Sequence, residues 1–69
     1  MNKKDFENLN EAYNAVFDGK GQIKNCERDA CIRLIDLMKE YTSKNVGNAD
    51  TGILDVDAVK SEYCRIIKI

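Results

Sequence analysis

Apolar residues recur along most of the chain at steps of three and four, the spacing that places side chains on one face of an α-helix. In the first such stretch they are Phe6, Leu9, Tyr13, Val16 and Phe17. Asn2 stands where a helix N-cap is needed, and Asp18 with Gly19 forms a typical stop signal. The pattern predicts a helix over residues 3–17.

The second stretch has the broadest apolar face of the chain, and it predicts a helix over residues 23–45. Its central stripe consists of Ala30, Leu34, Leu37, Met38 and Tyr41. The stripe is widened on one flank by Ile23, Cys31 and Ile35. Because so broad a face is typical of a helix with two neighbours, we expect this helix to be central.

A third stripe follows a connector rich in Asn, Asp and Gly, and it predicts a helix over residues 55–68. Either Asp55 or Asp57 can cap its start, and Ile53 with Leu54 is a candidate for a short extended piece before it. Three short-linked helices with one apolar face each bury those faces best as a compact three-helix bundle. We therefore expect an all-α fold and a single small helical domain over residues 1–69. The third stripe consists of Val56, Val59, Tyr63, Ile66 and Ile67.

Composition is that of a folded domain, with 43% hydrophobic and 33% charged residues. Eleven Lys and Arg residues nearly balance twelve Asp and Glu residues, and the net charge is −1. Neither a signal peptide nor a membrane helix is expected, because no apolar run has the required length. The three Cys residues, an odd number, suit a reducing compartment. We expect a cytoplasmic protein with no membrane contact.

The residue types that most often carry catalysis are scarce. The chain contains no His, so no nucleophile and base can be paired around Cys26, although Lys24 and Arg28 would favour its thiolate. Cys26 and Cys31 lie five residues apart, which on a helix separates them by about 140° and disfavours a shared zinc site. We expect no enzyme, no catalytic or metal-binding residue and no cofactor.

The acidic connector over residues 48–57 does not match a calcium-binding loop. An EF-hand loop needs oxygen ligands at its positions 1 and 3, Gly at 6 and Glu at 12. With Gly52 at position 6, the three ligand positions fall on Gly47, Ala49 and Ala58. A turn followed by a helix cap is the simpler interpretation.

Binding to nucleic acid is the alternative function. Residues 20–44 hold six cationic side chains against four acidic ones, a small surplus interleaved with acids. Binding to the phosphates of a nucleic acid requires cations that are clustered and not interleaved with acidic side chains, so the nucleic-acid hypothesis is disfavoured. Its candidate residues are Lys20, Lys24, Arg28 and Arg33.

Binding to protein is the function that the sequence favours. Tyr13, Tyr41 and Tyr63 lie one on each stripe and could meet at one edge of the bundle, and Tyr is enriched at protein interfaces. If three helices cannot cover the broad second stripe, Cys31 and Ile35 are left exposed beside Tyr41 as a contact site. We expect a non-catalytic regulatory module that acts by surface binding, either as a homodimer or as an inhibitor or adaptor of a larger protein.

Overall fold

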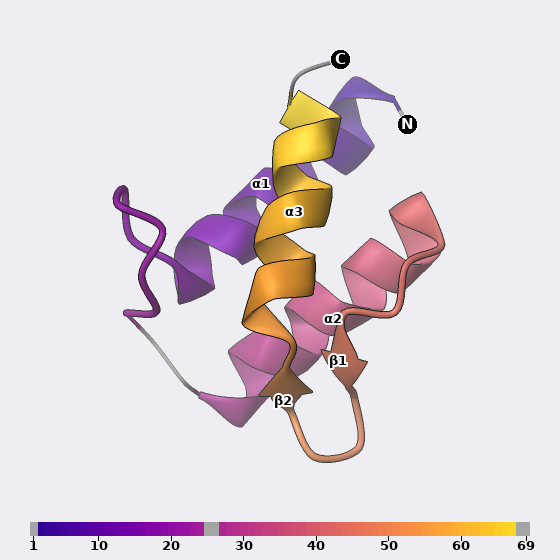
Figure 1. Cartoon of the computed structure of the whole chain (residues 1–69). Helices are drawn as coiled ribbons and strands as arrows, with labels where there is room; N and C mark the ends of the chain where they lie inside the picture. Colours follow the sequence, from indigo (N-terminus) through magenta and orange to yellow (C-terminus); the bar gives the residue numbers. More distant parts are fainter. Residues whose placement is uncertain (1, 25–26, 68–69) are drawn as a thin grey trace.

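The computed structural model of the chain describes residues 2–24 and 27–67. Three helices, α1 (Lys3–Val16), α2 (Arg28–Thr42) and α3 (Val56–Ile67), make up most of that part. Two short strands, β1 (Gly47–Asn48) and β2 (Ile53–Leu54), lie between α2 and α3. In Figure 1, α3 stands against α1 and α2, and the start of α1 and the end of α3 lie at the end of the molecule away from the strands.

Local capping rules explain where α1 begins and ends. The Asn2 side chain accepts a hydrogen bond of 2.8 Å from the backbone N–H of Asp5, as the sequence predicts for an N-cap. The helix ends at Val16, because Phe17 has extended backbone and forms an isolated antiparallel bridge with Ile23. Between them, the Asp18 carboxylate accepts hydrogen bonds from two backbone N–H groups and closes the turn.

The prediction that α2 starts at residue 23 is wrong, since the helix begins at Arg28. Ile23 fits the helical stripe but pairs with Phe17, and the Lys24 N–H donates to the Val16 carbonyl at 2.9 Å. At the other end, Ser43 takes a left-handed conformation with φ 62°, so α2 stops at Thr42 rather than at residue 45. The third helix agrees better, because the Asp55 carboxylate caps it by accepting from the Ala58 N–H at 3.2 Å.

The expected all-α bundle is correct for the three helices and wrong for the segment that joins α2 to α3. That segment is a small antiparallel hairpin in which Gly47 faces Leu54 and Asn48 faces Ile53. Gly52 takes a positive φ of 74° in its turn, a conformation that glycine adopts at little cost. The extended piece that the sequence suggested at Ile53 and Leu54 is β2, whereas its partner β1 is only two residues long and shows no alternating pattern.

The hairpin packs against α2 on the flank that carries Ile35, which the sequence predicted to be exposed if three helices could not cover it. A Cβ atom on Gly47 would lie 3.0 Å from the Ile35 side chain, and one on Gly52 would lie 2.8 Å from the Arg28 side chain. The hairpin thus follows α2 from its first turn to its middle. Ile35, which Gly47 packs against, is 1% exposed, and Cys31 is 6% exposed, so neither is left at the surface as the sequence would have allowed.

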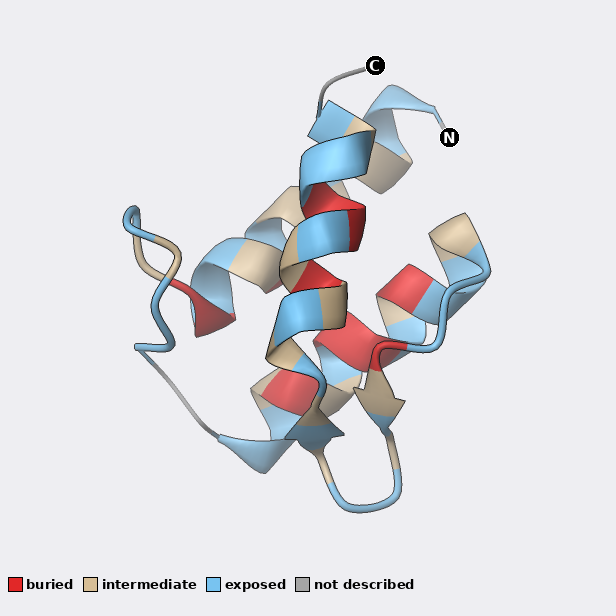
Figure 2. Ribbon diagram, in the orientation of Figure 1, coloured by how far each residue is buried: buried red, intermediate tan, exposed pale blue. Residues whose placement is uncertain are grey.

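The hydrophobic core lies where the three helices and the hairpin face one another (Figure 2). Fully buried side chains come from every helix and from the segments that flank them. In the described residues, no helix combines the length and apolarity needed to cross a membrane. The largest fully buried side chains are Phe17, Leu9, Leu34, Ile35, Met38, Val16, Val46 and Val59.

Substitution of Gly47 by Ala should destabilise the fold, because the added methyl group would lie 2.5 Å from the Ile53 carbonyl oxygen. Backbone atoms cannot move aside cheaply, so we expect a loss of about 1–3 kcal/mol in the free energy of unfolding. Chemical denaturation followed by circular dichroism measures it. Gly19→Ala is the control, since nothing lies within 4 Å of its Cβ position. Equal stability of the two variants would contradict the close approach of the hairpin.

Ile35→Asp should abolish folding rather than merely weaken self-association. The substitution would bury an unpaired carboxylate, a cost on the order of the whole stability of a domain this small, about 3–5 kcal/mol. Far-ultraviolet circular dichroism of the variant should show loss of helicity. A helical variant of unchanged stability would mean that the hairpin does not cover this flank.

Candidate binding groove

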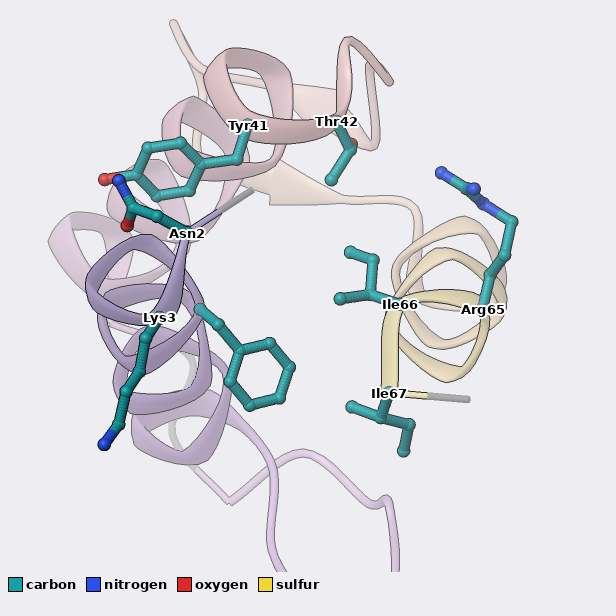
Figure 3. A pocket seen from close by; sticks show the side chains of 8 residues that line it. Asn2, Lys3, Tyr41, Thr42, Arg65, Ile66 and Ile67 are labelled. Carbon is teal, nitrogen blue, oxygen red and sulfur yellow. The ribbon is translucent and has the colours of Figure 1, made fainter. Parts of the chain in front are cut away.

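A groove of about 530 Å³ opens at the end of the molecule opposite the hairpin (Figure 3). It lies among the first turn of α1, the last turn of α2 and the last turn of α3. Ile66 points into the gap between α1 and α3, and Thr42 faces the same gap from α2 (Figure 3). Ile67 is 50% exposed, so a large apolar side chain borders open solvent here. The described residues that line the groove are Asn2, Lys3, Phe6, Tyr41, Thr42, Arg65, Ile66 and Ile67.

Local structure fixes the helix ends that form the groove. Asn2 caps α1 and so sets the position of its first turn. At the end of α2, the Thr42 hydroxyl lies 2.7 Å from the Met38 carbonyl, and Ser43 turns the chain away. Neighbouring helix residues point about 100° apart, so Ile66 and Ile67 face different directions from α3. Ile66 packs against the core, and Ile67 is left at the border of the groove.

A buried carboxylate lies next to the groove and holds one of its lining residues. Glu62 is 7% exposed, and it accepts a hydrogen bond from the Arg65 guanidinium one turn further along α3. This bond lowers the pKa of Glu62 below its usual value, and the positive charges of Arg65 and Lys44 and a hydrogen bond from the Thr42 hydroxyl act in the same direction. The single proton of Thr42 can go either to Glu62 or to the Met38 carbonyl. Glu62 thereby links α3 to the last turn of α2.

The three tyrosines that the sequence singled out separate into two places. Tyr13 and Tyr63 stack with ring centroids 3.8 Å apart, and Tyr13 also stacks on Phe17 at 4.6 Å. The Tyr63 hydroxyl donates to the Asn10 side chain, and burial is the main cause that raises the pKa of both stacked tyrosines. Tyr41 lines the groove instead. The structure therefore leaves only Tyr41 of the three in the apolar groove.

The four cations of the nucleic-acid alternative do not form one surface. Arg28 donates to the Asp50 carbonyl at 2.6 Å beside the hairpin, whereas Arg33 pairs with Glu11 of α1 at 3.4 Å. Lys20 and Lys24 belong to the turn after α1. Their backbone N–H groups bond within that turn or to the end of α1. The two arginines are thus engaged on different sides of α2.

Of the other residues considered from sequence, Cys31 and Ile35 lie in the interior and take no part in the groove. Cys26 lies outside the described residues. Within residues 2–24 and 27–67, no three acidic, Cys or His side chains come together in a way that could hold a metal ion.

Sequence reasoning missed most of the groove. It assigned Phe6, Ile66 and Ile67 to helix stripes and Asn2 to a helix cap, and it gave no binding role to Lys3, Thr42 or Arg65. The position of the groove depends on which helix ends meet, and that comes from the packing of α1, α2 and α3.

Comparisons with known proteins do not add a family to this geometry. No family model, curated protein or solved structure matches the chain.

Glu62→Gln should change how the stability depends on pH. A lowered pKa in the folded state means that ionised Glu62 stabilises the fold above its unfolded pKa of about 4.3. That contribution is lost as the pH falls through the lower folded value. We expect the variant to be less stable by about 1 kcal/mol near neutral pH, and to lose less stability than the wild type on acidification to about pH 3.

Urea unfolding at the two pH values measures both effects, and Glu40→Gln on the exposed face of α2 is the control. Some acid sensitivity should remain in the Glu62 variant, because backbone hydrogen bonds from Gln22 and Lys20 lower the pKa of Asp18 as well. Identical pH profiles for the wild type and Glu62→Gln would show that the Glu62 contacts do not stabilise the fold.

Proposed function

We propose that this protein is a small non-catalytic binding module that receives an apolar segment of another protein in the groove between its three helix ends. The observation that carries the proposal is the groove itself, where partly or largely exposed apolar side chains from all three helices border one hollow. Apolar side chains exposed together usually mark a contact site. They are Phe6 from α1, Tyr41 from α2, and Ile66 and Ile67 from α3.

The arrangement supports a protein partner better than a nucleic acid. A phosphate backbone is bound by clustered cations, whereas Arg28 and Arg33 are held apart by contacts within the chain. The groove instead offers the aromatic rings of Phe6 and Tyr41 beside aliphatic side chains, and aromatic residues are enriched at protein interfaces. Such a module would act as an adaptor or inhibitor of a larger protein, by occupying the segment that it binds.

The compartment proposed for this activity is the cytoplasm. Of the cysteines that the structure describes, Cys31 is buried and Cys64 is an exposed free thiol. Free thiols are typical of a reducing compartment.

Ile67→Asn tests the groove without adding a charge. The protein should capture a partner from extract of its source cells after chemical cross-linking, and the variant should lose that partner, with an affinity roughly tenfold lower once the partner is purified. Ile53→Asn is the matched control, since Ile53 is 68% exposed on the hairpin at the opposite end of the molecule. Circular dichroism checks that both variants remain folded.

Capture of the same proteins by the wild type and Ile67→Asn would exclude the groove as the binding surface. If Ile53→Asn loses the partner and Ile67→Asn keeps it, the binding surface lies on the hairpin rather than in the groove. Light scattering over a range of concentration adds the oligomeric state, because a groove that binds a second copy would show a concentration-dependent dimer that Ile67→Asn removes.

A further inference from the structure

The charges around the groove differ in sign from the charge of the chain as a whole. The protein carries a net charge of −1. Of the described residues that line the groove, only Lys3 and Arg65 are charged, and both are cations. Lys44 lies close enough to act electrostatically on Glu62 beside the groove. Two cations, Arg65 and Lys44, therefore act on the buried Glu62 carboxylate, and the charged side chains that line the described part of the groove are both positive.

Arg65 is the cation that is both fixed and accessible. Its Nη2 atom donates to the buried Glu62 carboxylate, while 57% of its side chain stays exposed. Figure 3 shows Arg65 extending from α3 toward the end of α2 that carries Thr42, whereas Lys3 points away from the gap. A guanidinium has five N–H donors in a planar fork. Glu62 therefore orients the group without using all of its donors.

We infer that the partner segment is an acidic apolar peptide, with apolar side chains in the groove and an Asp or Glu carboxylate paired with Arg65. This inference rests on the proposed function and names the chemistry of its partner. A carboxylate accepts hydrogen bonds from an arginine fork more strongly than a neutral amide does, and beside apolar side chains that bond is partly shielded from water. Phe6, Ile66 and Ile67 would contact the apolar residues on either side of it.

A phosphate-bearing partner fits these residues less well. Phe6, Ile66 and Ile67 offer no hydrogen bonds to a phosphate, and Lys3, the second cation of the lining, points away from the gap in Figure 3. A second copy of the chain is a further occupant that the experiment separates from a foreign peptide.

The test uses synthetic peptides as probes against the intact protein. One is a short amphipathic peptide with Leu on one face and Glu beside it, and the others replace Glu by Gln or by Lys. Fluorescence anisotropy of labelled peptides measures binding at low salt. The Glu peptide should bind about tenfold more tightly than the Gln peptide, and the Lys peptide should bind least.

The decisive variant is Glu62→Gln with Arg65→Gln, which removes the guanidinium without changing the net charge and leaves no buried carboxylate unpaired. It should reduce the affinity for the Glu peptide to that for the Gln peptide. The same pair of substitutions at Glu11 and Arg33, an ion pair between α1 and α2, is the matched control and should leave the preference intact.

Three results would overturn the inference. If the Glu and Gln peptides bind equally and Ile67→Asn weakens both, the groove binds apolar segments without regard to charge, and the proposed function remains. If no peptide binds, or if Ile67→Asn has no effect on peptide binding, the groove does not receive such peptides. If, in addition, the Ile67→Asn variant captures the same proteins from extract as the wild type, the proposed function is excluded as well. If the wild type dimerises through the groove, the occupant is a second copy.

Discussion

The contact between the hairpin and α2 determines which apolar surface the protein buries and which it leaves open. Gly47 lies against the Ile35 side chain and the backbone of β2, closer than any residue with a Cβ atom could lie without displacing them. This close approach lets the segment after α2 return along the helix and bury Ile35 together with Val46. In a domain this small, the side chains that the hairpin buries on one flank of α2 make up a large share of the hydrophobic core.

The hairpin covers one flank of α2 and itself exposes Ile53, whereas the groove exposes apolar side chains at the other end of the molecule. Tyr41 and Ile67 lie there, at the last turns of α2 and α3, beside the first turn of α1. Glu62 stabilises this end by a polar contact, since its buried carboxylate joins α3 to Thr42 and holds Arg65. The two ends of the molecule thus differ in chemistry: the hairpin end carries the exposed Ile53, and the other end combines an apolar groove with a fixed cation.

The sequence predicts the helices well because periodicity and capping are local properties. The caps at Asn2 and Asp55 and the three apolar stripes follow from residues near each other in the chain. The start of α2 was not predictable in this way, because Ile23 fits the helical stripe and is nevertheless taken by its bridge to Phe17. The hairpin and the groove depend on contacts between distant segments. Three of the residues singled out for binding, Cys31, Ile35 and Tyr41, consequently divide between the core and the groove.

The termini of the described chain have a practical consequence for any measurement on this protein. Asn2 and Ile67 both line the groove, so an affinity tag or fluorescent label fused to either end would be attached beside it. The hairpin turn at Thr51 is exposed and lies at the opposite end of the molecule (Figure 1). Attachment there would leave the groove unobstructed. A tag next to Asn2 or Ile67 could block the groove, and the tagged protein would then capture no partner even if the groove binds one.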